Sequence, residues 1–245
     1  VGYTHVTGGS RVTYATGIAV VNACKDAVDQ LRARAAMIWE VDVDGVVWED
    51  GHAKPAGSNV GDFDPLSLKD IAAKMGATGG AIGASSTVNA GGQAPGFATQ
   101  YCDVEVDPET GKVTVLRFVA AQDVGRAIHP GYVDGQIQGG VAQGIGWALN
   151  EEYIYDDKGR LQNAGFLDYR VPVASDLPNI ESVQVELPNP NHPFGVKGVG
   201  EVNICPVMAA ISNAVANAVG RRMDSLPMSP PKVLDALDNR SAEEL

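Results

Sequence analysis

The sequence predicts an α+β protein in which mixed or antiparallel sheets, partly built from hairpins, pack against long helices. Two observations lead to this class: three segments repeat apolar residues at helical spacing, and short alternating runs flank turn-forming residues. The chain has 245 residues, of which 44% are hydrophobic, so it can form one large domain or two smaller ones. We therefore treat residues 1–245 as one domain, with possible subdomains at 1–97 and 98–245.

The first third of the chain is dominated by one predicted helix, residues 14–39. Its apolar positions recur every three or four residues, with charged residues between them. They are Val21, Cys24, Val28, Leu31 and Ala35. A glycine-containing loop, TGGSRVT (residues 7–13), precedes this helix. Short strands are expected within 45–56 around a Glu-Asp-Gly turn, and a helix is expected from Ser67 to Met75.

The glycine-rich stretch 76–97 fits either a flexible loop or strands that lie close to a ligand or another chain. A clear hairpin follows, with alternating residues from Cys102 to Val106, a Pro-containing turn and a return strand from Val113 to Val119. A second hairpin is expected at 153–161, where Asp-Asp-Lys-Gly makes the turn.

Between these two hairpins, apolar residues recur every fourth position, which predicts a helix with one buried stripe. The stripe is Val133, Ile137, Val141, Ile145 and Leu149. The same segment contains several glycines, each of which costs a helix about 1 kcal/mol relative to alanine. Tight helix packing or a bound ligand would compensate for this cost. Gln136, Gln143 and Trp147 should project from the opposite face.

The last part of the chain is expected to contain a strand at 181–187, a glycine-rich segment and two helices. The first helix starts near Pro206 and stops at Gly220, residues suited to a first turn and a C-terminal cap. The second is short, near 232–237. The segment between the strand and the first helix reads PFGVKGVGE, residues 193–201.

Composition excludes several classes of function. Eighteen Lys and Arg against 30 Asp and Glu give a net charge of −12, which disfavours nucleic acid as a partner. No stretch approaches the roughly 20 apolar residues of a membrane span, and no export signal opens the chain, so we expect a soluble, cytoplasmic protein. The three cysteines and four histidines are scattered, which predicts buried free thiols and no metal held by protein side chains.

The TGGSRVT loop combines backbone N–H groups at a helix start with a hydroxyl and an arginine, which together favour an anion. The candidate residues are Gly8, Gly9, Ser10 and Arg11. Glycine-serine loops before helices are common, however, and most of them bind nothing. A purely structural loop is therefore the alternative for this segment taken alone.

PFGVKGVGE is the more informative motif. Gly195, Gly198 and Gly200 allow the backbone to approach a ligand closely, and Lys197 can orient an anion or the loop itself. Glu201 closes the segment, and a desolvated carboxylate there would have a raised pKa and suit proton abstraction. The alternative is that Glu201 caps the helix that follows it.

The order of these motifs resembles the C-terminal, molybdopterin-binding half of the large subunit in molybdenum hydroxylases of the xanthine dehydrogenase and aldehyde oxidase family. The resemblance covers nearly the whole chain and is strongest from Tyr101 to Leu237. Its most specific parts are DVG…HP, GGVAQGIG and GVKGVGE, which stand in family order, after TGGSR and around DYRVP.

This resemblance implies a molybdenum-cofactor-binding domain and names roles for individual residues. It implies that Glu201 is the catalytic base and takes a proton from a molybdenum-bound hydroxide, whose oxygen attacks an electron-poor carbon. It implies that Gln143 hydrogen-bonds the pterin. Cofactor contacts are also expected from Gly8, Gly9, Ser10, Arg11, Lys197, Gly198 and Gly200. The metal is then held by the dithiolene of a molybdopterin, in bacteria usually its cytosine dinucleotide, and not by a protein side chain.

The chain lacks the family's first cofactor-binding half, with its FGGGFG-like loop, and every iron–sulfur ligand. We therefore expect an incomplete active site that needs the other molybdopterin-binding half, an iron–sulfur subunit and a flavin (FAD) subunit. Further residues are expected upstream, on another subunit or in the same gene product. The substrate is left open among purines, N-heterocycles, aldehydes and carbon monoxide. A noncatalytic cofactor-carrying or assembly subunit and a plain nucleotide-binding module are the alternatives.

Overall fold

The computed structural model describes residues 4–89, 91 and 93–238. By its internal contacts the chain forms two compact units. The larger unit combines Val1–Tyr14 with Gly92–Leu245, and the smaller unit is Ala15–Gly91. The first fourteen residues therefore group with the later part of the chain, which a division at residue 97 does not anticipate.

The smaller unit is built on α1 (Gly17–Trp39), which confirms the long helix expected at 14–39. A π-helical turn, Val12–Thr16, precedes it, and Glu40 ends it in the left-handed conformation. Only Ala35 and Ala36 of α1 are buried, and Cys24 is exposed. The other residues of the predicted apolar stripe, Val21, Val28 and Leu31, are half-buried, because only the end of the helix packs against a sheet within this unit.

That sheet joins β1 (Val46–Glu49), β2 (His52–Pro55) and β3 (Leu66–Ser67) in antiparallel order. The predicted strands around residues 49–51 are thus confirmed. The short helices α2 (Leu68–Ala73) and α3 (Met75–Thr78) follow. Ser67 and Asp70 form a reciprocal capping box that starts α2, as the serine indicated. Most of the stretch after α3 is irregular, which favours the loop interpretation of 76–97.

The larger unit contains a three-stranded mixed sheet in the order β4-β5-β6. The strands β4 (Ala98–Val106) and β5 (Val113–Asp123) form the predicted hairpin, and β6 (Asn179–Val185) pairs parallel to β5. The second predicted hairpin is present in a short form. Tyr155 and Leu161 make an antiparallel bridge, and the N–H groups of Asp156 and Gln162 donate to the carbonyl oxygens of Arg160 and Ile154, at 3.0 and 2.7 Å. The Asp156 carboxylate also accepts the N–H groups of Lys158 and Arg160, which closes the turn.

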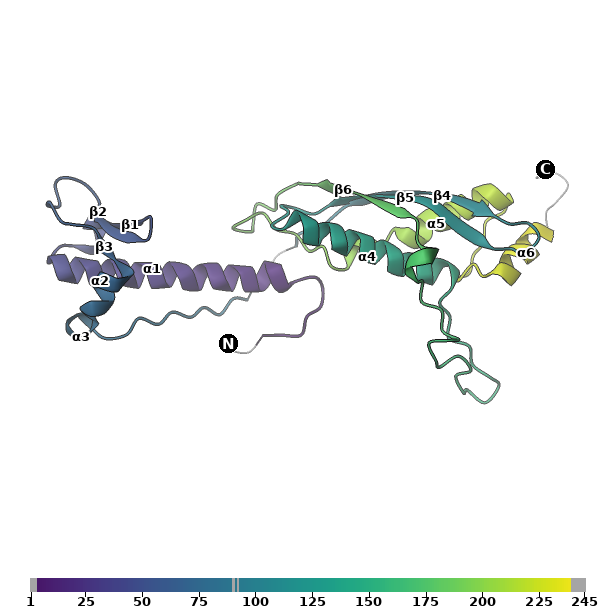
Figure 1. Ribbon diagram of the computed structural model, residues 1–245, viewed down its shortest axis with the longest axis horizontal. Coiled ribbons are helices and arrows are strands. Elements are labelled where there is room, and N and C mark those ends of the chain that lie inside the picture. Colours follow the sequence, from purple (N-terminus) through teal and green to yellow (C-terminus); the bar gives the residue numbers. More distant parts are fainter. Residues whose placement is uncertain (1–3, 90, 92, 239–245) are drawn as a thin grey trace. The chain divides into compact units, whose positions relative to one another are not determined.

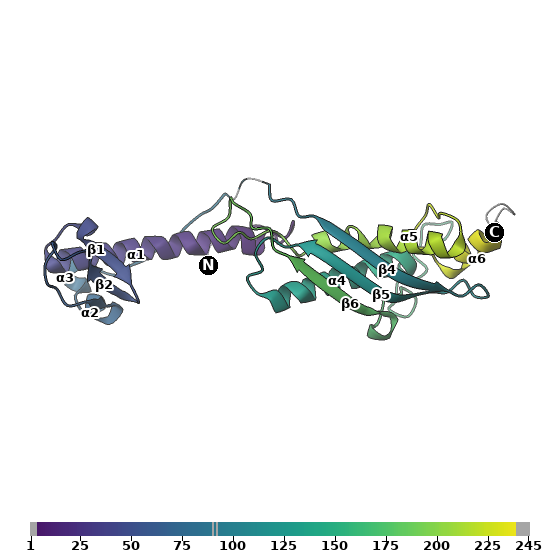
Figure 2. The same cartoon turned by 90° about the horizontal axis from the view of Figure 1, so that it is seen from above.

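Two helices cover one face of this sheet, α4 (Pro130–Leu149) and α5 (Val207–Val219) (Figures 1 and 2). Both confirm predicted helices, and Gly220 ends α5 with a φ of 75°. The predicted stripe of α4 packs against Phe118 and Ala120 of β5 in the main core. The short helix α6 (Pro230–Asp238) adds Val233 to the same core.

One segment, Val202–Val219, is long and apolar enough for a membrane span by length and composition alone, contrary to the expectation that no such stretch exists. The structure gives it another place. Val207, Ile211, Val215 and Val219 are completely buried against the sheet and α4. We therefore describe α5 as a core helix of the larger unit.

The glycines of α4 divide into two groups. At Gly140 a Cβ would lie 2.6 Å from the Cβ of Asn203, and at Gly144 it would overlap Val207. At Gly135 and Gly139 a Cβ would meet nothing within 4 Å. Gly146 belongs with the first group, since a Cβ there would lie 2.7 Å from Pro172 Cδ. Tight packing, one of the two explanations given by the sequence, thus accounts for these three glycines, while Gly135 and Gly139 lie on an open face.

This division predicts opposite effects of the same substitution. We expect Gly144→Ala to lower the free energy of unfolding by about 1–3 kcal/mol, because the methyl group must displace Val207. Gly139→Ala should raise it by up to about 1 kcal/mol, because alanine favours the helix and meets no neighbour. Denaturant unfolding of both variants checks this, and equal shifts would contradict the packing explanation.

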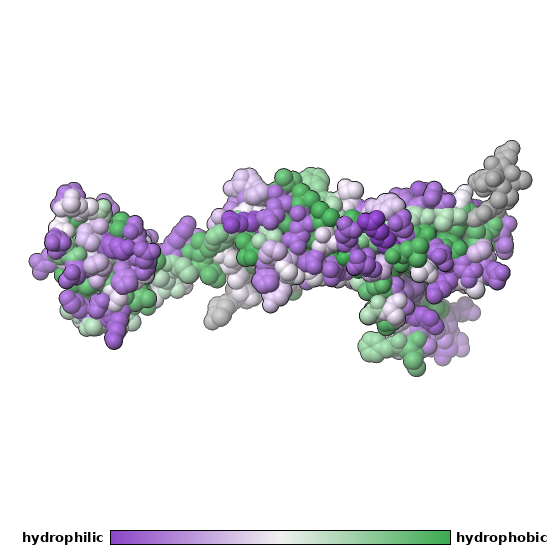
Figure 3. Space-filling model, turned by 45° about the horizontal axis from the view of Figure 1, so that its top comes forward, coloured by the Kyte–Doolittle hydropathy of each residue, from purple (hydrophilic) through white to green (hydrophobic). Residues whose placement is uncertain are grey.

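The chain between α4 and β6 forms a long irregular projection (Figure 1). It includes a 3₁₀ turn, Ala174–Asp176. Phe166 and Leu167 are almost fully exposed on it, and hydrophobic residues gather on this projection (Figure 3). Apolar side chains at this exposure are unusual in an isolated domain.

The cysteines only partly follow the expectation of buried thiols. Cys102 is buried on β4, and this burial raises its pKa to about 11. Cys24 and Cys205 are exposed, which corrects the prediction for these two residues. All three thiols are free.

Candidate functional site

Two loops far apart in the sequence meet in the larger unit, the TGGSR loop and the end of GVKGVGE. The Glu201 N–H donates to Ser10 Oγ at 2.9 Å, across 191 positions of sequence. Added Cβ atoms would lie 2.7 Å from Ser10 Cβ at Gly198 and 3.2 Å from Ser10 Oγ at Gly200. These glycines therefore make room for Ser10, whereas the sequence suggested close approach to a ligand.

The TGGSR loop reaches this position through two left-handed residues in succession. Gly9 has a φ of 63° and Ser10 a φ of 55°. The conformation is easy for glycine but uncommon for serine, so the structure places a mild backbone strain at the contact with Glu201.

A buried ion pair anchors the middle of the GVKGVGE segment. Lys197 Nζ lies 2.6 Å from Asp123 Oδ2, and only 12% of the lysine side chain and 3% of the aspartate side chain are exposed. Asp123 ends β5, and its second oxygen accepts the N–H of Gly125 at 3.0 Å. The pair thus joins the DVG motif to GVKG, and it supports the loop-orienting alternative for Lys197.

Glycines allow the same two motifs to touch along their backbones. Gly125 and Gly195 both have positive φ angles, 65° and 71°. An added Cβ at Gly125 would lie 2.6 Å from the Gly195 carbonyl oxygen. Arg126 N donates to that same oxygen at 2.9 Å, and Gly125 forms a bridge with Val196. Two of the three family-like motifs are therefore parts of one packed structure.

His192 adds a second connection to the N-terminal segment. Its Nδ1 accepts the N–H groups of Phe194 and Val196, at 3.2 and 3.4 Å. The proton of a neutral ring must then reside on Nε2, which lies 3.1 Å from the carbonyl oxygen of Tyr14 and donates to it. The His192 and Tyr14 rings are also in contact, with centroids 4.8 Å apart. The imidazole thus fixes Tyr14 beside the glycine-rich loop.

Glu201 itself is exposed in this chain. It precedes a 3₁₀ turn, Val202–Ile204, but its side chain makes no capping hydrogen bond. The helix-capping alternative is therefore not what the structure shows. The described residues also do not desolvate this carboxylate, so burial would require groups from outside them.

The cofactor-loop candidates leave open backbone beside one cation. Added Cβ atoms at Gly8 and Gly9 would meet nothing within 4 Å. Arg11 is exposed and takes part in none of the hydrogen bonds or ion pairs found among residues 4–89, 91 and 93–238. Open backbone beside a free guanidinium fits a phosphate or another anionic group.

Gln143 lies on the exposed face of α4, as do Gln136 and Trp147, which confirms the predicted orientation of this helix. The Oε1 of Gln136 lies 3.5 Å from the Cβ position of Gly200, so this side chain reaches the two loops. Gln143 lies two turns farther along α4, roughly 10 Å away. In the described part of the chain, no hydrogen bond joins Gln143 to the Ser10–Glu201 contact.

Sequence reasoning missed Asp123, His192 and Gln136 as members of this site. Asp123 carried a signal, because an aspartate at the end of a strand and a lysine within a glycine-rich segment can form a buried ion pair. Gln136 was recognised only as facing away from the core. No pattern in the sequence marks His192.

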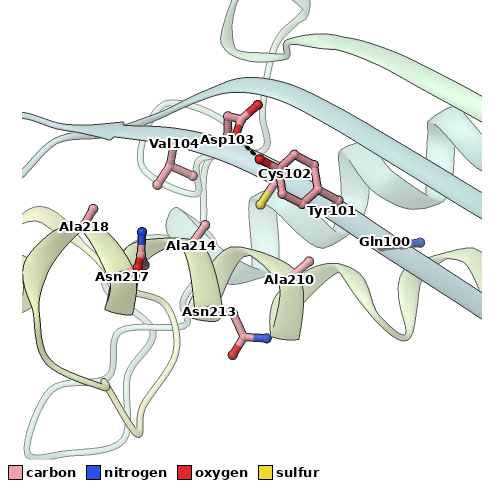
Figure 4. A pocket seen from close by; sticks show the side chains of 10 residues that line it. All are labelled: Gln100, Tyr101, Cys102, Asp103, Val104, Ala210, Asn213, Ala214, Asn217 and Ala218. Atoms are coloured by element: carbon pink, nitrogen blue, oxygen red, sulfur yellow. Dashed lines mark hydrogen bonds between the residues drawn. The ribbon is translucent and has the colours of Figure 1, made fainter.

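A hollow of the described surface lies elsewhere, between β4 and α5 (Figure 4). Its volume is about 370 Å³, and it is lined by residues 100–104 and by small or amide residues of α5. It shares no residue with the Ser10–Glu201 contact. Within the residues that the structure describes, no three His, Cys, Asp or Glu side chains are placed to hold a metal ion.

Comparisons with known proteins show the family of the chain. Residues 1–178 match the family model of the molybdopterin cofactor-binding domain. The matched range ends before Glu201. The putative xanthine dehydrogenase molybdenum-binding subunit of Escherichia coli (strain K12) is 40% identical over 176 residues, 69% of this chain and 23% of that protein.

Two solved structures have the same fold. Quinoline 2-oxidoreductase from Pseudomonas putida 86 superposes with a TM-score of 0.83 at 28% identity, over 96% of this chain and 31% of that one. Carbon monoxide dehydrogenase from Oligotropha carboxidovorans gives a TM-score of 0.81 at 25% identity, over 97% and 30%. The chain thus spans less than a third of each of these proteins. It belongs to the molybdopterin-binding domain family of the molybdenum hydroxylases, as the order of its motifs indicated.

Proposed function

We propose that this chain is the C-terminal, cofactor-binding part of the large subunit of a molybdenum hydroxylase, and that Glu201 is its general base. The observation that carries this proposal is the Ser10–Glu201 hydrogen bond, because it joins the candidate cofactor loop to the candidate base. Glu201 makes no competing side-chain contact as a helix cap. Its carboxylate is therefore free to accept a proton.

The residues present fit a molybdopterin dinucleotide. Gly8 and Gly9 leave open backbone, and Arg11 supplies an unpaired cation for a pyrophosphate, which we take to be that of the cytosine dinucleotide form. Ser10, Gln143, Lys197, Gly198 and Gly200 complete the candidate contacts. When bound, the pterin-held molybdenum supplies the oxidation of the substrate carbon and takes up the electrons.

In this proposal the protein's own chemistry is a proton transfer. A water-derived oxygen adds to an electron-poor carbon, and the Glu201 carboxylate accepts the proton that this oxygen gives up. Lys197 is held by Asp123 and fixes the loop that carries the base. Ser10 holds the backbone of the base at its N–H group.

We also propose that the site is completed by partners. Glu201 and Arg11 are exposed, and the chain spans less than a third of its relatives. The other molybdopterin-binding half would cover both residues, so the chain alone should be inactive. Electrons would leave through iron–sulfur and flavin (FAD) subunits of a cytoplasmic hetero-oligomer.

The substrate class we favour is a purine, N-heterocycle or aldehyde, since the xanthine and quinoline enzymes are among the similar proteins. Oxidation of carbon monoxide is a second candidate, favoured by the fold similarity to carbon monoxide dehydrogenase. A noncatalytic cofactor-carrying subunit is a third, and the exposed position of Glu201 is the observation on its side.

Metal and cofactor analysis of the purified complex tests the proposal. We expect one molybdenum for each copy of this chain, and release of a cytosine nucleotide on hydrolysis of the cofactor. Substrate-dependent reduction of an acceptor then separates an enzyme from a carrier subunit. A complex that lacks molybdenum after expression with a full cofactor supply would contradict the proposal.

Arg11→Glu tests the cofactor loop directly. Reversal of this charge places a carboxylate beside the expected pyrophosphate, so we expect molybdenum occupancy at least about tenfold lower than in the wild type at limiting cofactor. Arg222→Glu is the matched control, because Arg222 is also exposed but lies just beyond α5. Equal occupancy in the two variants would mean that the loop is only structural.

A further inference from the structure

We propose that Ser10 is a positioning residue for Glu201: its hydroxyl fixes the backbone of the base and couples it to the cofactor loop. This inference rests on the proposed function, and it assigns Ser10 a role beyond that of an anion ligand. It is argued from three independent features of the contact, namely the hydrogen bond, the space around Ser10 and the backbone conformation.

The hydrogen bond satisfies a group that the local structure leaves without a partner. Glu201 is the N-cap of the 3₁₀ turn Val202–Ile204, and N–H groups at such a start have no acceptor within the turn. Ser10 Oγ is the acceptor, at 2.9 Å. A hydroxyl has two acceptor sites and one donor, so Ser10 keeps its own proton for a second partner, such as a phosphate. One side chain can therefore contact both the base loop and an anionic ligand.

The surrounding residues are shaped to this side chain. An added Cβ at Gly198 would lie 2.7 Å from Ser10 Cβ and 3.2 Å from its carbonyl oxygen. At Gly200 it would lie 3.2 Å from the hydroxyl. Ser10 is thus wedged against the two glycines that precede Glu201. Any movement of Ser10 is transmitted to the backbone of the base.

The backbone conformation of Ser10 also supports the positioning role. Its φ of 55° lies in a region that glycine, asparagine and aspartate tolerate better than serine. Glycine would remove the strain but also the hydroxyl, which is the group that contacts Glu201. Tyr14 lies four residues after Ser10, and its carbonyl oxygen accepts a hydrogen bond from His192. The N-terminal segment is therefore held to the segment that carries Glu201 at two points.

Two substitutions in the assembled enzyme distinguish the effect of losing the Ser10 hydroxyl from the effect of relieving its backbone strain. Ser10→Ala and Ser10→Gly both remove Oγ, but only glycine relieves the left-handed backbone. We expect kcat per bound molybdenum to fall about tenfold in both, which corresponds to one hydrogen bond, with KM changed less than twofold. The melting temperature should be higher for Ser10→Gly than for Ser10→Ala. A merely structural role predicts that kcat follows the melting temperature instead.

Amide hydrogen exchange gives a readout that does not depend on turnover. The peptide containing the Glu201 N–H should exchange faster in both Ser10 variants, because its acceptor is lost. Gly198→Ala should have the same effect by displacing Ser10, whereas Gly165→Ala should not, since its nearest contact is an ordinary 4.0 Å from Asp168.

The failures of the two proposals are distinguishable. If Glu201→Gln stays active, the base assignment fails. If Glu201→Gln is inactive while both Ser10 variants keep normal kcat per molybdenum and normal exchange at Glu201, the positioning role alone is overturned. A loss of kcat that occurs in Ser10→Ala but not in Ser10→Gly also overturns it, since strain and not the hydroxyl would then be the cause.

Discussion

Glu201→Gln in the assembled enzyme is expected to lower kcat by about 10²–10⁴ while molybdenum content stays near that of the wild type. The amide has almost the shape of the carboxylate but does not accept a proton at neutral pH. The backbone hydrogen bond from Glu201 N to Ser10 is unaffected by the change, so the loop should keep its place. The measurement is steady-state turnover divided by the molybdenum bound.

Glu105→Gln is the matched control for this substitution. Glu105 is exposed on β4 and has no part in the two loops, so its variant should keep wild-type turnover. Retained activity in Glu201→Gln would remove the base assignment. Loss of molybdenum together with activity would instead show that Glu201 serves cofactor retention.

Asp123→Asn should produce the largest loss of stability among the site variants. Asparagine can still accept the Gly125 N–H, but Lys197 is left as an unpaired charge that is only 12% exposed. Breaking a buried ion pair in this way costs about 3–5 kcal/mol. For a chain of this size that corresponds to a melting temperature lower by roughly 6–20 °C.

Two further variants isolate the charge as the cause. Asp123→Asn combined with Lys197→Met removes both charges and should recover most of the stability, because no unpaired ion remains. Glu181→Gln breaks the ion pair between Glu181 and Arg117, in which the side chains are 50% and 57% exposed. This change should lower the free energy of unfolding by no more than about 1 kcal/mol. A single Asp123 variant as stable as the Glu181 variant would contradict this account.

The helices and the first hairpin could be predicted because their signals are local. The four-residue repeat of α4 needs only an apolar surface to pack on, and β5 supplies it. The predicted stripe of α1 is buried only at its end, at Ala35. Periodicity shows which side of a helix is apolar, but not whether another element covers it, and at Cys24 none in its unit does.

The site was predictable in its parts but not in its assembly. Sequence pattern selected Ser10 and Glu201 separately, but nothing in the chain indicated that one contacts the other. The glycines at 198 and 200 suggested close approach, and only the structure identifies Ser10 as the group that approaches. His192 could not be found at all, because its role depends on a backbone carbonyl, which every residue has.

The distance along the chain between Ser10 and Glu201 has a consequence for the order of folding. The nearest paired residues of the β4–β5 turn, Val106 and Val113, are seven positions apart, whereas Ser10 and Glu201 are separated by 191. Closing the longer loop directly from the unfolded chain therefore has an entropic free-energy cost about 3 kcal/mol higher. We therefore expect the hairpin and its helices to form before the two loops meet. The contact between Ser10 and Glu201 is in this sense expected to be among the last to form, since it needs both segments already in place.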